Sequence, residues 1–111
     1  MYYVYAHVAP DNGELLYIGK GTDARAWSKR DRKCGHVEVL EALEKEYGRG
    51  CYVKIIADYL DQSDALLLER GLIWMNQPSM NEQRYELKDD AVLDYRDLYP
   101  TIDWLWRPPV I

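Results

Sequence analysis

The chain has 111 residues, of which 48% are hydrophobic and 30% charged; this composition is typical of one folded domain and excludes a disordered chain. No apolar run approaches the roughly 20 residues of a membrane-spanning helix, and no basic region followed by an apolar stretch opens the chain. We therefore expect no membrane anchor, no signal peptide and a cytoplasmic location, and the net charge of −5 argues against simple nonspecific DNA binding.

The charge is unevenly distributed along the chain. Between Lys20 and Lys33 there are six basic and two acidic residues, whereas from Glu82 to the end there are seven acidic and four basic ones. A basic patch and an acidic tail within one chain soften the objection to a nucleic-acid partner, because binding depends on local charge.

The cysteine and histidine content leaves one alternative, a structural zinc site. Cys34 lies two residues before His36, but such sites need about four ligands and His7 is the only other histidine. We therefore favour reduced thiols at Cys34 and Cys51, as in a cytosolic protein.

The first sixty residues predict three strands, with one short and one longer helix between the second and the third. Aromatic and β-branched residues alternate over 2–8, which predicts a half-buried strand, and the turn sequence Pro-Asp-Asn-Gly at 10–13 predicts a hairpin to a second strand at 15–18. Helical spacing of apolar residues after Gly35 predicts an amphipathic helix that ends before Gly48. Residues 52–60 read as a third strand, central because of its high apolar content.

The hairpin places two tyrosines on neighbouring strands, and a basic turn follows the second. Tyr5 and Tyr17 should lie within reach of a shared site. Two glycines bracket Lys20 directly after the second strand, and Thr22 or Asp23 is placed to cap a short helix that carries Arg25. Backbone N–H groups at such a strand-to-helix junction suit phosphate.

Residues 64–75 form a strongly apolar helix that contains a single inner acid, Glu69. Its neighbours one helical turn away are Ala65, Leu66, Leu72 and Ile73. A carboxylate in this company must be paired, protonated or bound to a cation, because burying a bare charge is expensive.

These residues together resemble the GIY-YIG nucleases, over roughly residues 2 to 82. The resemblance rests on Tyr3-Val4-Tyr5, on Tyr17-Ile18-Gly19-Lys20-Gly21 with Arg25, and on Glu69 with Asn81 twelve residues later. The Lys20 stretch is similar to the Gly-Lys-Gly subgroup of that family, while Tyr3 stands where the family has its leading glycine. The resemblance implies an α/β fold with a small three-stranded, mostly antiparallel sheet and flanking helices in residues 1–82. Residues 83–111 form the acidic C-terminal extension, which we expect to be laid against the core.

The resemblance also implies roles for single residues. Glu69 would be the one protein ligand of Mg²⁺ or Mn²⁺, Arg25 would bind the scissile phosphate, and Tyr5 and Tyr17 would line the site, one helping to activate water. Lys20 would bind phosphate or lower the pKa of a tyrosine, and His7 and His36 are weaker candidates for a proton relay. The residues expected to support substrate binding are Gly19, Gly21, Arg30 (the second candidate for the arginine role) and Asn81.

The implied function is metal-dependent hydrolysis of DNA phosphodiester bonds, selective for DNA structure or directed by a protein partner, since the chain has no room for a recognition domain. Two alternatives stay open. The first is a catalytically silent binding module of the same fold whose acidic tail masks the basic patch. The second is an acidic mimic of DNA that engages another nucleic-acid enzyme.

Overall fold

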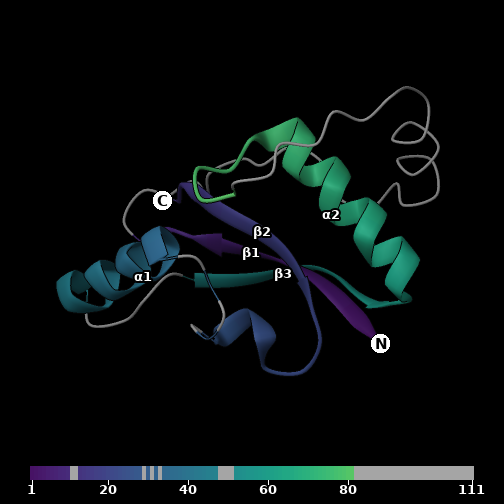
Figure 1. The fold of residues 1–111 in the computed structure, drawn as a ribbon, viewed down its shortest axis with the longest axis horizontal. Helices are drawn as coiled ribbons and strands as arrows, with labels where there is room; N and C mark the ends of the chain where they lie inside the picture. The colour runs from purple at the N-terminus through teal and green to yellow at the C-terminus, as the bar shows by residue number, and fades with distance from the viewer. Residues whose placement is uncertain (11–12, 29, 31, 33, 48–51, 82–111) are drawn as a thin grey trace.

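The protein folds into a three-stranded antiparallel sheet with two α-helices, as predicted (Figure 1). The computed structural model describes residues 1–10, 13–28, 30, 32, 34–47 and 52–81, so the predicted extension 83–111 lies outside the described residues. The elements in chain order are β1 (Tyr2–Val8), β2 (Leu15–Gly21), a one-turn 3-10 helix η1 (Arg25–Trp27), α1 (Cys34–Tyr47), β3 (Tyr52–Leu60) and α2 (Gln62–Asn76).

The central strand is β1, which pairs antiparallel with β2 on one side and with β3 on the other. The predicted hairpin joins β1 to β2, and Gly13 takes a positive φ of 71° near its base, where its N–H donates to the Ala9 carbonyl. The side chains of β1 alternate between the two faces of the sheet, as the sequence predicted. Both faces are covered, however, so the strand is buried from Tyr3 to Val8 and not half-buried as expected.

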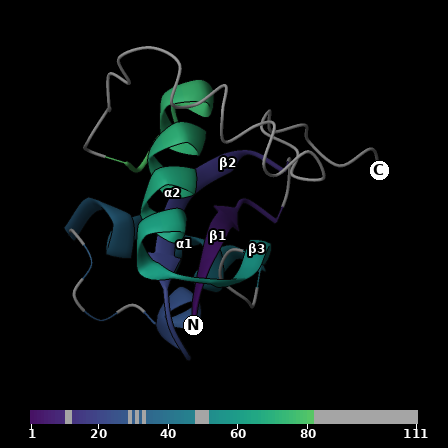
Figure 2. The same ribbon diagram turned by 90° about the vertical axis from the view of Figure 1, so that its right-hand side faces the viewer.

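The two faces of the sheet have different covers. Helix α2 packs on the face that bears Val4, Ala6 and Ile18, where Leu68 and Leu72 complete the apolar core. Full burial of one such side chain contributes about 1.5–3 kcal/mol. Figure 2 shows α2 beside β1 and β2, with β3 on the other side of β1. The opposite face carries tyrosines and is met by η1.

The prediction that residues 52–60 form the central strand was wrong. β3 lies at an edge of the sheet, and Tyr52, Ile55 and Tyr59 remain 44%, 37% and 79% exposed. The apolar content of a strand indicates how much of it can be buried. The apolar content does not decide the order of the strands. β1 is central because β2 pairs with one of its edges through the hairpin and β3 pairs with the other.

Helix α2 begins and ends with conventional caps. The Asp61 side chain accepts a hydrogen bond from the Asp64 N–H at 2.8 Å, and Gln77 ends the helix in the left-handed conformation with φ 49°. In the part of the chain that the structure describes, neither helix combines the length and the apolar character that crossing a bilayer requires.

Candidate active site

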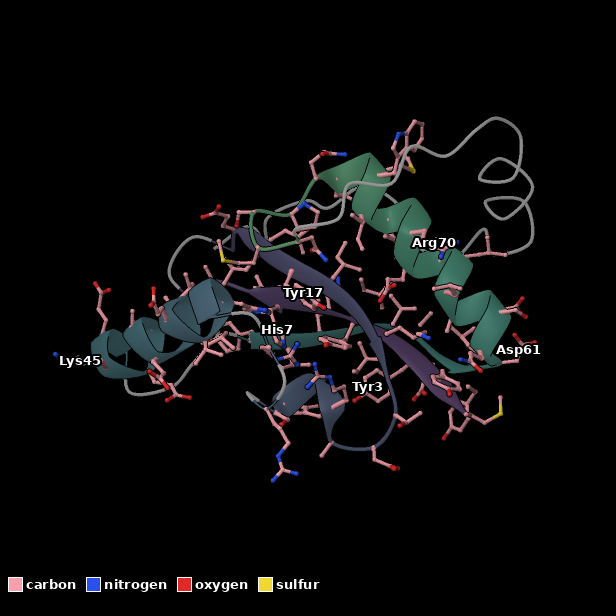
Figure 3. The ribbon with its side chains drawn as sticks, viewed as in Figure 1. Tyr3, His7, Tyr17, Lys45, Asp61 and Arg70 are labelled. Atoms are coloured by element: carbon pink, nitrogen blue, oxygen red, sulfur yellow. The ribbon has the colours of Figure 1, made fainter. Side chains whose placement is uncertain are left out.

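Tyr5 and Tyr17 lie side by side on the face of the sheet opposite α2, as the hairpin predicted. Their ring centroids are 6.1 Å apart, because Tyr17 faces His7 across the ladder and Tyr5 faces Gly19. Figure 3 shows Tyr17 and His7 close together and away from Arg70 on α2. Tyr5 is buried, whereas Tyr17 is partly exposed, so Tyr17 is the phenol that a bound molecule can reach first.

The two tyrosine rings close over Gly19. A Cβ atom added at Gly19 would lie 2.6 Å from the Tyr5 Oη and 2.8 Å from a Tyr17 ring carbon, and a Cβ at Gly21 would lie 2.8 Å from the Arg25 Cβ. Both glycines therefore make room for site side chains. A direct contact of Gly19 or Gly21 with substrate stays a prediction.

The predicted glycine turn and capped helix are not present. β2 continues through Lys20 to Gly21, and Arg25 lies in a three-residue 3-10 helix whose N-cap, Ala24, makes no side-chain cap. The segment is held from β1 instead, because the Tyr3 hydroxyl donates to the Asp23 carbonyl and accepts from the Ala26 N–H. Phosphate binding by a helix N-terminus therefore has no basis at this junction.

The cation over the two tyrosines is Arg32, which sequence reasoning did not single out. Its guanidinium donates to the Tyr5 Oη at 3.0 Å and lies 5.7 and 5.5 Å from the ring centroids of Tyr5 and Tyr17. These are cation–π distances. Arg32 belongs to the basic run after Lys20, but nothing in the spacing distinguished it from its neighbours.

Arg25, the predicted phosphate ligand, lies at the same site, and the role expected of Arg30 stays a prediction. The Arg25 charge lowers the pKa values of Tyr5 and Tyr17, although less than other causes raise them. The Arg25 guanidinium also donates to the Arg30 carbonyl. The side chain of Arg30 is exposed, so its candidacy for the arginine role has no support from the described contacts.

Glu69 reaches the site from the other layer, at the outer edge of β2. Its carboxylate accepts a hydrogen bond from the Lys20 N–H, and its charge raises the pKa of Tyr17. Burial raises the pKa of Glu69, while the positive charge of Lys20 and the Lys20 N–H act in the opposite direction. Glu69 as a whole residue is partly exposed.

Lys20 therefore accompanies the acid and not the phenols. In a strand, successive side chains alternate between faces, so Lys20 lies on the face opposite Tyr17, with its Nζ 5.2 Å from the centroid of the Tyr2 ring. Among the described residues, the cations that lower the tyrosine pKa values are Arg25 and Arg32, which is the role we expected of Lys20.

Burial dominates the pKa values of both phenols. Desolvation raises the pKa of Tyr5 above its ordinary value, against the opposing hydrogen bond and charge of Arg32. Desolvation also raises the pKa of Tyr17, followed by the neighbouring Tyr5 and by the charge of Glu69. Both phenols are therefore neutral near pH 7 in the unliganded protein.

His7 and His36 form a buried hydrogen-bonded pair beside the phenols. The two rings are joined from His7 Nδ1 to His36 Nε2 at 3.1 Å, and the His36 ring packs against the Tyr17 ring at a tilt of 39°, with centroids 4.5 Å apart. Burial is the largest cause that lowers both histidine pKa values to about 4, so both rings are neutral at pH 7.

The tautomers of the pair follow from the Ala26 carbonyl. His7 Nε2 lies 2.7 Å from this oxygen, which can only accept, so His7 carries its proton on Nε2. A neutral His7 then accepts at Nδ1, and His36 donates from Nε2. Both rings are oriented by these bonds, and a proton relay through them stays a prediction.

Asn81 holds the edge of the site strand. Its amide accepts from the Ile18 N–H and donates to the Ile18 carbonyl, both at 2.9 Å, and the adjacent Met80 N–H donates to the Leu16 carbonyl. The loop after α2 thus bonds to the outer edge of β2 on either side of Tyr17. Asn81 is buried and uses its amide on backbone, so its expected contact with substrate stays a prediction.

The residues present fit a weakly held magnesium or manganese ion and do not form a closed metal cage. Within the described ranges, no three His, Cys, Asp or Glu side chains gather around a common point. Mg²⁺ does not need such a set, because it keeps several waters and binds proteins through one or two carboxylates. Glu69 is a suitable single ligand, since its burial penalises an uncompensated negative charge.

Two phenols and two guanidinium groups thus lie together on one face of the sheet, and the Glu69 carboxylate meets the Lys20 N–H at the outer edge of β2. Comparisons of the chain with protein-family models, with curated proteins and with solved structures found no match.

Proposed function

We propose that the protein is a metal-dependent endonuclease that hydrolyses phosphodiester bonds in DNA, in the manner of the GIY-YIG nucleases that its sequence resembles. One observation supports this most strongly. The Tyr5 and Tyr17 rings lie 6.1 Å apart beneath the Arg32 guanidinium, and the Glu69 carboxylate accepts a hydrogen bond from the Lys20 N–H on the strand that carries Tyr17. Phosphoryl transfer depends mainly on positioning and charge stabilisation, which such a group of side chains provides.

The reaction assigns a task to each group. Glu69 would hold the divalent cation, which when bound supplies Lewis acidity toward a phosphoryl oxygen. The partly exposed Tyr17 orients the attacking water, and the buried Tyr5 supports it from below. Arg25 offsets the negative charge that develops as the water oxygen bonds to phosphorus and the bond to the leaving oxygen breaks.

The water must lose a proton as it attacks, and a neutral phenol is a poor acceptor. The raised pKa of Tyr17 has three leading causes: burial, the adjacent Tyr5 and the Glu69 charge. Compensation of the Glu69 charge would remove the third cause and lower the Tyr17 pKa, so that the Tyr17 phenolate takes the proton of the attacking water while the leaving oxygen departs with the bonding electron pair, its charge offset by Arg25.

We also propose that the protein is cytoplasmic and that a protein partner supplies its specificity for DNA.

The proposal is tested by incubating the protein with branched and linear DNA in the presence of Mg²⁺ or Mn²⁺. Wild type should cut at least one substrate, and Glu69→Ala should lose about a hundredfold or more of the rate. Glu41→Ala, which removes an exposed acid from α1, is the matched control and should cut like wild type. DNA binding without cutting in every variant would indicate the silent binding module, and neither binding nor cutting would contradict both proposals.

A further inference from the structure

The Arg32 side chain makes three hydrogen bonds, and they join two parts of the chain that are distant in sequence. Besides its bond to Tyr5 on β1, the guanidinium donates to the Arg25 carbonyl at 2.8 Å and to the Ser28 carbonyl at 2.6 Å. Arg25 begins η1 and Ser28 directly follows it. One planar group thus fixes η1 to the central strand of the sheet.

A guanidinium suits this position because its donors point in fixed directions within one plane. A lysine ammonium carries the same charge but is a compact group on a flexible stem, so it cannot reproduce three divergent bonds to fixed partners. Arg32 is partly buried and lies over both tyrosine rings, where the cation also gains from the ring faces.

We propose that Arg32 is a positioning residue that clamps the Tyr5 phenol to the segment carrying Arg25, an inference that rests on the proposed nuclease function. The clamp holds the phenols at a set distance from the guanidinium that meets the phosphate. Misplacement of reacting groups by about 1 Å can reduce a rate about a hundredfold, so the loss of such a bridge should appear in the chemical step more than in binding.

The contact itself can be measured without DNA. Five charged or titratable groups face Tyr5. They are Arg25 at the start of η1, Arg32 in the chain after η1, Tyr3 and His7 on the same strand, and Tyr17 on β2. The Arg32 hydrogen bond and charge favour the phenolate, so Arg32→Gln should raise the Tyr5 pKa. This shift is followed by NMR titration of protein labelled with ¹³Cζ-tyrosine, in which Tyr5→Phe assigns the resonance.

Arg30→Gln is the matched control, because it removes the same charge from an exposed arginine two residues away. It should leave the Tyr5 titration unchanged, whatever it does to DNA binding. An unchanged Tyr5 midpoint in Arg32→Gln overturns the clamp. This experiment decides the contact even if wild type cuts no DNA, an outcome that would contradict the proposed function alone.

The positioning role is tested by single-turnover cleavage at saturating DNA. Arg32→Gln should cut about tenfold or more slowly than wild type, with a smaller change in DNA affinity. A wild-type rate alongside a shifted Tyr5 midpoint overturns the positioning role. If Arg32→Gln does not fold, Arg32→Lys keeps the charge without the planar group. It should still cut slowly, and a wild-type rate in it overturns the proposal.

Discussion

At the residue scale, the tightest requirement is the missing side chain of Gly19. Tyr5 and Tyr17 converge over this residue, so the space that a methyl group would need is already filled by two rings. The rings are large and are held by neighbours, Tyr5 by Arg32 and Tyr17 by His36. A side chain at Gly19 must therefore displace the phenols themselves.

We predict that Gly19→Ala abolishes cleavage, because the new Cβ would lie 2.6 Å from the Tyr5 Oη, and that it costs about 1–3 kcal/mol of stability from overpacking. Cleavage assays and urea unfolding measure the two effects. Gly35→Ala on α1 is the control, since its Cβ meets nothing within 4 Å, and it should be neutral or slightly stabilising. Normal cleavage by Gly19→Ala would contradict the ring geometry.

The residue pattern predicted the tyrosine pair and Arg25, but not Arg32. Tyr5 and Tyr17 follow from one hairpin, which is a local feature. Lys20 lies three residues after Tyr17, so in a continuous strand its side chain lies on the opposite face. We expected Lys20 in a glycine turn after the strand, and this face was therefore not predicted. Arg32 reaches Tyr5 across 27 residues through an irregular segment, and no periodicity describes such a path.

At the element scale, α1 is joined to the sheet by the imidazole pair of His7 and His36. Both rings are buried and both pKa values lie near 4, below the ordinary value of 6.5. Between these two values the unfolded chain binds protons that the folded protein excludes. The contribution of this pair to stability is therefore complete above about pH 6.5 and is lost as the pH falls toward 4.

We predict that lowering the pH from about 7.5 to about 5.5 reduces the free energy of unfolding by about 1–3 kcal/mol through this pair. The double variant His7→Gln, His36→Gln keeps a donor at each Nε2 position but does not titrate, so it should show a smaller loss. Urea unfolding at both pH values measures the difference. An equal pH dependence in the two proteins would show that the imidazoles are not buried as a neutral pair.

The loop after α2 supports β2 at its outer edge through Asn81. Loss of this amide leaves the buried N–H and carbonyl of Ile18 without their partner. Asn81→Ala should cost about 1–3 kcal/mol, and amide exchange at Ile18 should accelerate. Asn76→Ala is the comparison, because the Asn76 amide donates to the Leu72 carbonyl of its own helix. Unchanged protection at Ile18 would contradict the edge contact.

The helices and strands themselves were largely predictable, and their order was not. Residues 62–76 form a helix because the Asp61 cap and the continuous apolar run agree, and the hairpin follows from its turn sequence. β3 was predicted as the central strand, but β1 occupies that position. Strand pairing depends on contacts between segments that are distant in sequence, which the composition of one segment does not specify. Tyr59, for example, lies in the apolar segment that forms β3, yet it is 79% exposed because β3 is an edge strand.

At the scale of the whole molecule, charge is divided between a basic stretch in the site region and an acidic segment from Glu82 onward. If the acidic segment masks the basic patch, neutralising Asp89, Asp90 and Asp94 to Asn should tighten DNA binding several-fold at low salt, and the gain should vanish as salt screens the charges. The control neutralises three exposed acids on α1, Glu38, Glu41 and Glu46. An equal gain in both variants would assign the effect to net charge alone.

The proposed nuclease function depends most on Glu69, which accepts a hydrogen bond from the Lys20 N–H at the edge of β2 and would bring a divalent cation to the phenols. The most direct measurement is the broadening of ¹³Cζ-tyrosine resonances by Mn²⁺. We predict that Mn²⁺ broadens Tyr17 well before Tyr59, which is exposed on β3, and that Glu69→Gln removes this selectivity. Broadening that does not favour Tyr17, or that persists unchanged in Glu69→Gln, would contradict this prediction.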